Sequence, residues 1–349
     1  MKRTMVKGIL CALSILFAVF PAFAGGGSDK GSASKGPEQK PYVMKLAHGV
    51  ATSDPLHQTA EKFKELAEKY SNGRIKIELY PQAQLGDEQA LVQSLRSASI
   101  QLSIIYSGNA QASTPSIGAV MLPYLYTTSE EAWKGLDAVS GELSNRMIKE
   151  SGARILGFYE KGFRVLTNSK KPIKRIEDMQ GLKIRVTPSD IPLQTFKAWG
   201  IDPIPMAWAE VFTALQQKVI DGQENPYTTI PSMKFEEVQK YVTEIHYMLW
   251  TGPLLVSEKY YQTLPEDIKQ VLQKAGKESA EWERKLNASL TEEAIVKIKQ
   301  SGMVNVGAPE DEAEWQKRAQ EIWPKFYEKA GGKEWVEYVI KTVKEANKK

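Results

Sequence analysis

Residues 42–80 read YVMKLAHGVATSDPLHQTAEKFKELAEKYSNGRIKIELY, and this stretch decides the fold class. Residues 42–47 predict a short strand, and the apolar residues of 55–70 recur at the spacing of one helix face. The dipeptide Asn72-Gly73 then turns the chain into residues 74–80, where polar and apolar side chains alternate as in a half-buried strand. The stretch therefore predicts a strand, a helix and a second strand in direct succession.

The same alternation continues along the rest of the chain. It predicts strands at 102–106, 153–159, 164–167, 182–186 and 253–256, helices at 85–97, 191–199 and 208–217, and a turn at 221–226. From residue 265 onward the chain is largely helical and highly charged. Strands that alternate with helices indicate an α/β fold with a mostly parallel sheet, and 349 residues are enough for two domains.

The first 24 residues have the layout of a secretory signal peptide. Three basic residues among the first seven precede an apolar run at 8–20, and Ala22-Phe23-Ala24 is a small-x-small cleavage site. We expect cleavage after Ala24, so that residues 1–24 are removed and the mature protein is exported. Residues 25–40 are rich in Gly, Ser and Lys and predict a flexible linker.

Removal of this segment changes both the net charge and the cysteine content. The whole chain has 46 Lys+Arg and 42 Asp+Glu. The signal peptide carries Lys2, Arg3 and Lys7 and no acid, which leaves 43 basic residues against 42 acidic ones in the mature chain. Nucleic acid is excluded as a partner because no basic excess remains to neutralise phosphates. The single cysteine, Cys11, is also removed, which excludes a disulfide framework and a thiolate metal cluster.

The chain carries none of the common sequence motifs of enzymes. It has no Gly-x-Ser-x-Gly elbow, no Walker phosphate loop, no His-Glu-x-x-His motif and no Gly-x-Gly-x-x-Gly after a strand. His48 and His57 flank one strand-to-helix connection, and we interpret them as a loop residue and a helix-surface residue. We therefore expect no catalytic residue, metal or cofactor, and an exported hydrolase is the least favoured alternative.

A few polar and aromatic residues are suited to holding a carboxylate. Arg185 ends the predicted strand 182–186, where ligands of open α/β sheets dock, and its planar guanidinium matches a carboxylate. A surface or structural arginine fits the same position. Asn225 lies in the predicted turn, where it can bind a hydroxyl or carboxylate or can simply form the turn. The aromatic residues near them, which suit either a pocket wall or the core, are Trp208, Tyr227, Tyr247 and Trp250.

Longer motifs carry a resemblance to a known family. They are Tyr80-Pro-x-x-x-Leu85-Gly86, Met121-Leu-Pro-Tyr124, Gly181-Leu-Lys-Ile-Arg185-Val186, Pro205-Met-Ala-Trp208-Ala-Glu210-Val211 and Asp221-Gly-Gln-Glu-Asn225-Pro226. Over residues 42–345 the sequence resembles the extracytoplasmic solute-binding proteins of TRAP (tripartite ATP-independent periplasmic) transporters. The last motif, at its distance from Arg185, is highly specific for them.

The resemblance implies an α/β, two-lobed periplasmic binding protein of type II-like fold, with a hinge and a long connecting helix. Lobe I would comprise residues 41–161 plus about 251–290, and lobe II residues 162–250 plus about 291–349. Such a protein captures an organic acid, either a C4-dicarboxylate or a sugar-acid-like carboxylate, in the interlobe cleft and delivers it to the small and large membrane subunits. We expect a monomer; binding of an aromatic or other monocarboxylate, and a sensory co-receptor role, are the alternatives.

The resemblance also assigns roles to individual residues. Arg185 and Asn225 match the arginine and asparagine that hold the ligand carboxylate, and Trp208 matches the aromatic residue that packs against the ligand. Arg164 matches a second arginine, and Glu88 matches an acid that can meet ligand hydroxyls.

Departures from the family pattern narrow the ligand. Sialic-acid binders carry Glu and Arg where this chain has Tyr106 and Asn109, and Asn where it has Gly49, which argues against sialic acid. Aromatic residues at 106, 208, 227 and 250 leave room for an aromatic acid. The expected ligand-binding set is Arg185, Asn225, Arg164, Trp208, Glu88, Tyr106, Tyr227 and Trp250.

Overall fold

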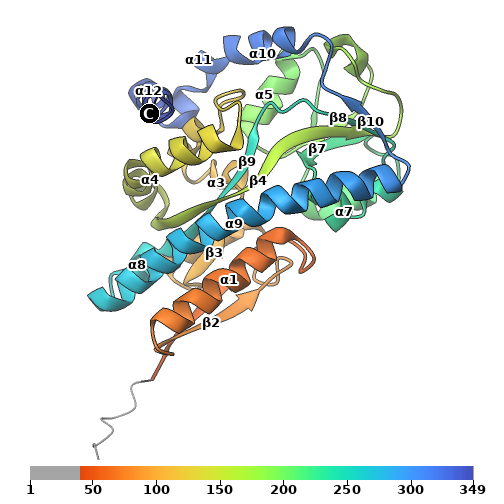
Figure 1. The fold of residues 1–349 in the computed structure, drawn as a ribbon. Helices are drawn as coiled ribbons and strands as arrows, with labels where there is room; N and C mark the ends of the chain where they lie inside the picture. The colour runs from red at the N-terminus through yellow and green to blue at the C-terminus, as the bar shows by residue number, and fades with distance from the viewer. Residues whose placement is uncertain (1–39, 349) are drawn as a thin grey trace, which may run out of the picture. The chain divides into compact units, whose positions relative to one another are not determined.

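The computed structural model describes residues 40–348, so the predicted signal peptide and residues 25–39 of the predicted linker lie outside the described residues (Figure 1). The strands are β1 (Tyr42–Ala47), β2 (Ile75–Tyr80), β3 (Leu102–Ile104), β4 (Ala153–Asn168), β5 (Ile184–Val186), β6 (Ile204–Pro205), β7 (Gly222–Pro226), β8 (Tyr241–Thr243), β9 (Leu249–Ser257) and β10 (Val304–Gly307). The helices are α1 (Pro55–Tyr70), α2 (Glu88–Ser97), α3 (Ser107–Ala110), α4 (Ser129–Ser151), α5 (Asp190–Ala198), α6 (Val211–Gln216), α7 (Thr229–Ser232), α8 (Glu258–Tyr261), α9 (Glu266–Gln300), α10 (Glu312–Glu321), α11 (Trp323–Phe326) and α12 (Lys333–Ala346). The predicted α/β class is confirmed.

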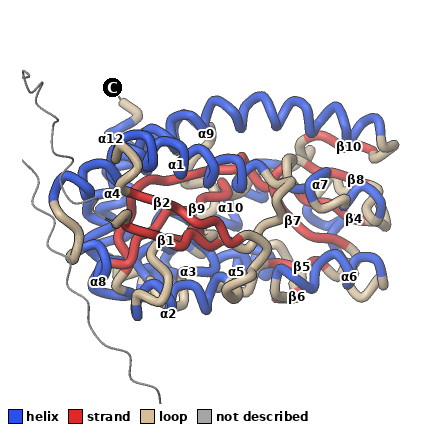
Figure 2. The backbone as a smooth tube through the Cα atoms, turned by 90° about the horizontal axis from the view of Figure 1, so that it is seen from below, coloured by secondary structure: helices blue, strands red, loops and turns tan. Residues whose placement is uncertain are grey.

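Two groups of paired strands share strand β4 (Figure 2). The first sheet has the order β2-β1-β3-β9-β4, and the second continues from β4 through β7 and β5 to β6. Strand β8 also pairs with β4 and carries β10 at its other edge. The pairs are parallel except for those made by β4 and β9. The sheets are therefore mixed, and the expectation of a mostly parallel sheet was wrong because these two long strands run against their neighbours.

Strand β4 passes from one sheet to the other near Glu160. It pairs with β9 as far as Phe163 and with β7 from Arg164 onward, and its register shifts between Glu160 and Phe163. Gly162 lies in this interval with a φ of 91°, which a residue with a Cβ atom rarely adopts. The strands predicted at 153–159 and 164–167 are thus one strand that is irregular at this point.

The start of helix α1 is set by its local sequence. The Asp54 side chain accepts a hydrogen bond from the Leu56 amide at 2.9 Å, and Pro55 occupies the first turn, where its missing amide hydrogen costs nothing. The apolar face that includes Leu56 and Phe63 is buried, and the helix packs on β2 and α9. These contacts fix the position of Asp54, which bears on the site described below.

Helix α9 spans 35 residues and packs along β4 and α1 (Figure 1). It approaches β4 closely because glycines face each other. A Cβ atom on Gly276 would lie 2.5 Å from the Leu156 carbonyl oxygen, and one on Gly157 would lie 2.7 Å from the Gly276 carbonyl oxygen. Only residues without a side chain fit both positions. This is the long helix that the family resemblance implies.

Several boundaries differ from the sequence prediction. Residues 222–226, predicted as part of a turn, form strand β7 and are buried between β4 and β5. The helix predicted at 208–217 is a 3₁₀ turn at Trp208–Glu210 followed by α6. The helix predicted at 85–97 begins only at Glu88, where the Asp87 side chain caps it. Strands β8 and β10 had no counterpart in the prediction.

The buried apolar residues form two clusters. The larger surrounds the first sheet and reaches α5 and α12, and the smaller gathers around β7 and α6, with Val165, Val211, Phe235 and Ile298 among its members. Helix α12 packs on α4. The division of the chain into the two lobes stays a prediction. Within residues 40–348, no helix combines the length and the apolar character that a membrane crossing requires.

Candidate functional site

Two buried arginines lie on the two strands that flank β7 in the second sheet. Arg164 on β4 and Arg185 on β5 have exposed fractions of 1% and 2%, and strand β7 lies between their strands. Arg164 forms an ion pair with the Glu224 carboxylate, in which Nη2 donates to Oε1 at 2.9 Å and Nε donates to Oε2. Nη2 also donates to the Glu224 carbonyl at 2.8 Å. Nη1 of Arg164 is buried and has no hydrogen-bond partner among the described residues.

Arg185 has no carboxylate partner among the described residues. Its Nε and Nη2 atoms donate to the Met206 carbonyl oxygen at 3.1 and 2.7 Å, and its guanidinium lies 5.8 Å from the centre of the Trp208 ring. Burial lowers the pKa of Arg185 to about 10, and the positive charge of Arg164 contributes to this shift. The negative charge of Glu224 opposes it. Arg185 therefore stays protonated at neutral pH, as a buried cation without a paired anion in the part of the chain that the structure describes.

Asn225 links strand β7 to the Arg164 side chain. Its Oδ1 accepts a hydrogen bond from Arg164 Nη2 at 3.2 Å, and its Nδ2 donates to Gln223 Oε1 at 2.6 Å. The residue is paired with Val165 on β4 and is buried. Sequence reasoning placed Asn225 in a turn, whereas it is held inside a sheet.

An aromatic pair lies against this cluster. Tyr106 and Trp250 stack with ring centres 5.4 Å apart, and the Arg164 guanidinium lies 5.1 Å from the centre of the Tyr106 ring. On the other side, Lys161 Nζ lies 5.4 Å from the centre of the Trp250 ring. Burial raises the pKa of Tyr106 to about 12, so its hydroxyl remains a donor, and this hydroxyl has no partner among the described residues.

Glu88 lies beside Tyr106 and is half-buried. It accepts hydrogen bonds from the Tyr106 amide at 3.3 Å and from the Asn109 side-chain amide. Burial raises the pKa of Glu88, although both hydrogen bonds favour the ionised form. A Cβ atom on Gly49 would lie 3.5 Å from Glu88 Cγ, so the loop after β1 reaches the same place.

The remaining aromatic candidates have different surroundings. Trp208 is half-buried, lies against Arg185, and packs its ring at 6.0 Å from that of Phe235. The hydroxyl of Tyr227 donates to Glu244 Oε1 at 2.6 Å. The ring of Tyr227 belongs to the smaller apolar cluster, and none of its recorded hydrogen bonds joins it to the arginines.

Two features of the site were missed from the sequence. Glu224 lies inside a motif that was recognised, but its pairing with Arg164 depends on the alignment of β7 with β4. The Tyr247 hydroxyl donates to Glu224 Oε2 at 3.0 Å, which was also not predicted. The only available signal was the position of Glu224 in the Asp221–Pro226 motif.

The two histidines lie in the predicted elements. His48 follows β1 in a loop and is fully buried, and its Nε2 lies 3.0 Å from Nδ1 of His57, which is half-buried on α1. Burial lowers the pKa of His48 to about 4. Among the described residues, no group of three or more His, Cys, Asp or Glu side chains is arranged to hold a metal ion.

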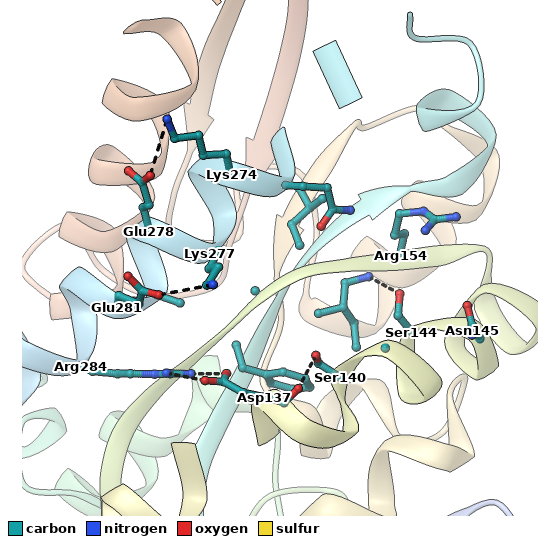
Figure 3. A pocket seen from close by; sticks show the side chains of 17 residues that line it. Asp137, Ser140, Ser144, Asn145, Arg154, Lys274, Lys277, Glu278, Glu281 and Arg284 are labelled. Atoms are coloured by element: carbon teal, nitrogen blue, oxygen red, sulfur yellow. Dashed lines mark hydrogen bonds and ion pairs between the residues drawn. The ribbon is translucent and has the colours of Figure 1, made fainter. Parts of the chain in front are cut away.

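A hollow of about 980 Å³ lies elsewhere, between α4, β4 and α9 (Figure 3). Its charged side chains largely pair with one another: Arg284 reaches Asp137 at 2.6 Å, and Lys274 and Lys277 lie near Glu278 and Glu281. None of the expected ligand-binding residues lines it. The arginine cluster differs from this hollow because it contains a buried charge, that of Arg185, without a paired carboxylate among the described residues.

Residues 46–330 match DctP, the bacterial extracellular solute-binding proteins of family 7. The chain belongs to this family. Members are binding proteins rather than enzymes, and the type II-like α/β fold with its long helix α9 is that of the TRAP solute-binding proteins. The 2,3-diketo-L-gulonate-binding periplasmic protein of Escherichia coli is 30% identical over 260 residues, which are 74% of this chain and 79% of that protein.

Solved structures of DctP proteins superpose on the described fold. A TRAP periplasmic solute-binding protein of Rhodobacter sphaeroides, in an apo, open and partially disordered form, is 50% identical with a TM-score of 0.78, over 87% of this chain and 99% of that one. The sugar-acid-binding protein of Advenella mimigardefordensis in complex with galactonate is 31% identical with a TM-score of 0.83, over 88% of this chain and 99% of that one.

Proposed function

We propose that this protein captures a singly charged, hydroxylated carboxylic acid of sugar-acid size and delivers it to the membrane subunits of a TRAP transporter. The observation that carries the proposal is the charge balance of the buried cluster. Arg164 is paired with Glu224, and Lys161 is paired with Asp54, whereas Arg185 has no paired carboxylate among the described residues. Of these three buried cations, Arg185 is thus the one left for an anionic group of the ligand.

The physical reason is the cost of an uncompensated buried charge. A buried ion is costly unless it is paired and hydrogen-bonded, and a ligand carboxylate supplies both for Arg185. Each charge-assisted hydrogen bond contributes about 1.5–3 kcal/mol. Asn225 lies on β7, which pairs with the strand that carries Arg185, and this supports a role for its amide beside that carboxylate. The Trp208 ring lies against the Arg185 guanidinium.

The other end of the site suits hydroxyl groups. The Tyr106 hydroxyl and Arg164 Nη1 are donors without partners in residues 40–348, and Glu88 is an acceptor close to Tyr106. A second carboxylate placed near Glu88 would meet an acid of the same charge, whereas a hydroxyl can donate to it. A polyhydroxy acid therefore fits better than a dicarboxylate.

Named relatives support both classes of acid. Galactonate and 2,3-diketo-L-gulonate are sugar acids with one carboxylate, bound by the proteins of Advenella mimigardefordensis and Escherichia coli. Relatives from Bacillus subtilis and Rhodobacter capsulatus are named for C4-dicarboxylates. The charge balance of this chain is our reason for choosing the first class.

The proposal includes the place of action and the partners. Family membership and the expected signal peptide support a periplasmic, monomeric protein that is processed after Ala24, and lobes I and II as expected from the sequence would enclose the ligand. The membrane subunits would recognise the liganded form, in which contacts with the acid favour closure of the lobes.

The proposal is tested by calorimetry with a small panel of compounds. The panel contains D-galactonate and D-gluconate, succinate and L-malate, and D-galactose as the neutral counterpart of D-galactonate. We expect the sugar acids to bind at least about tenfold more tightly than the dicarboxylates, and D-galactose to show no binding. Tighter binding of succinate or L-malate would overturn the choice of ligand class, and failure of every acid to bind would overturn the function.

A further inference from the structure

We propose that Asp54 joins the two lobes when the ligand is enclosed, and that its contact with Ser232 slows ligand release. This inference rests on the proposed function, because it assumes that the lobes close around an acid. Asp54 is absent from the expected ligand-binding set, and its carboxylate contacts neither Arg164 nor Arg185.

Three structural elements meet at the Asp54 carboxylate. Oδ1 caps helix α1 through the Leu56 amide, and Oδ2 accepts from Lys161 Nζ at 2.6 Å. The Ser232 hydroxyl lies 3.4 Å from Oδ2 and 3.2 Å from the Thr229 carbonyl oxygen, so its one proton is shared between these two acceptors. The Ser53 hydroxyl donates to the Ser232 carbonyl at 3.4 Å. The exposed fraction of Asp54 is 2% and the Lys161 side chain is 4% exposed, so both charges are removed from water.

The contacts connect parts of the chain that belong to different sheets. Helix α1 packs on β2 of the first sheet, and α7, which ends at Ser232, packs on β7 of the second. Lys161 lies where β4 leaves β9 and before it pairs with β7 at Arg164. Asp54 therefore spans the point where the two sheets separate, 178 residues away from Ser232 in the sequence.

A rotation of one sheet against the other would affect these contacts unequally. The capped amide of Leu56 is two residues from Asp54 and moves with it, and Lys161 lies where β4 passes from one sheet to the other. The contacts of Ser232 with Asp54 and Ser53 connect α7 on the second sheet to the start of α1 on the first. Opening of the two lobes would therefore break these contacts. The carboxylate would then exchange a protein hydroxyl for water while keeping its charge partner.

The first test measures release of D-galactonate by stopped-flow tryptophan fluorescence. Ser232→Ala removes the hydroxyl that reaches Asp54 but leaves the α1 cap and the Lys161 pair intact. We expect its dissociation rate to rise at least about threefold while the association rate changes less than about twofold. Ser140→Ala is the matched control, because the Ser140 hydroxyl donates only to the Asp137 carbonyl within α4. Equal dissociation rates for Ser232→Ala and the wild type would overturn the proposal.

The second test does not depend on a ligand. Spin labels are attached to Lys69→Cys on α1 and Lys240→Cys before β8, both exposed positions in a mature chain that has no other cysteine. We expect the ligand-free distance distribution of Ser232→Ala to shift towards longer distances than that of the labelled wild type. An unchanged distribution would overturn the role of Ser232 even if D-galactonate binds, whereas a shift without any acid binding would refute the proposed function alone.

Discussion

The charge balance of the buried cluster can be altered by one substitution, Glu224→Gln. This change keeps the size of the side chain and removes the charge that neutralises Arg164. The cluster would then contain two guanidinium groups without a paired anion, Arg164 and Arg185. We expect the variant to gain affinity for dicarboxylates such as succinate and L-malate, because a second anionic group of the ligand can take the place of Glu224.

The magnitude follows from the contacts that Glu224 makes. Two unit charges about 4 Å apart interact by about 4 kcal/mol at an effective dielectric constant near 20, and desolvation of the second carboxylate offsets part of this. We therefore expect dicarboxylate affinity to rise by at least about tenfold, or about 1.4 kcal/mol. The ligand-free variant should lose stability by about 3–5 kcal/mol, since Arg164 is left buried without its partner.

Calorimetry and thermal denaturation measure the two effects separately. Glu237→Gln serves as the matched control, because Glu237 is exposed and its nearest cation, Lys234 Nζ, lies 4.0 Å away. A pair of this kind contributes about 0–1 kcal/mol, so the control should leave both affinity and melting temperature nearly unchanged. Dicarboxylates should restore the melting temperature of Glu224→Gln more than sugar acids do.

The result that refutes this reasoning is a loss of affinity for every acid in the folded Glu224→Gln variant. Glu224 would then serve to hold Arg164 in place for ligand binding. Its charge would not be what determines the preference for sugar acids over dicarboxylates. Unchanged dicarboxylate affinity with intact sugar-acid binding would likewise contradict the charge balance.

Three further predictions concern single side chains. Arg185→Lys keeps the charge but loses the planar pair of donors, so calorimetry should give at least about tenfold weaker sugar-acid binding; wild-type affinity would remove Arg185 from the site. Gly276→Ala should lower the free energy of unfolding in urea by about 1–3 kcal/mol, because the added methyl group meets the Leu156 carbonyl. Gly141 is a helical position with open space around it, so Gly141→Ala should instead raise the free energy of unfolding by about 0.5–1 kcal/mol. The same change in stability for both variants would refute the close contact between α9 and β4. Burial raises the pKa of Glu283 well above its usual value, so the folded protein keeps a proton that the unfolded chain loses, and the free energy of unfolding should fall as pH rises from about 4.5 through the folded-state value. Glu283→Gln should flatten that part of the stability–pH profile, and an unchanged slope would contradict the assignment.

The sequence predicted elements whose signal is local. The alternation in residues 42–80 predicted β1, α1 and β2 to within one residue, because each has its own periodicity and its own turn or cap. Strand β7 was assigned to a turn because Asp221–Pro226 contains Gly, Asn and Pro and no β-branched residue. It becomes a strand because β4 and β5 pair with it on both sides, which no local propensity reflects.

The candidate site was predictable only in part, because contacts between distant strands, like the pairing of β7, leave no local signal in the sequence. The family motifs pointed to Arg185 and Asn225, which lie on the neighbouring strands β5 and β7. The pairing of Arg164 with Glu224 joins residues 60 positions apart, and that of Lys161 with Asp54 joins residues 107 apart. Both pairings depend on the course of β4 between the two sheets. They decide how much positive charge is left for a ligand, which residue types alone do not reveal.

The most direct measurement for the central claim is a crystal structure of the complex with the acid that binds most tightly in the calorimetric panel. We predict that the ligand carboxylate lies within hydrogen-bond distance of the Arg185 guanidinium, that the Arg164–Glu224 pair remains intact, and that ligand hydroxyls lie near Tyr106 and Glu88. A carboxylate bound away from Arg185, or a second carboxylate displacing Glu224 from Arg164, would contradict the account.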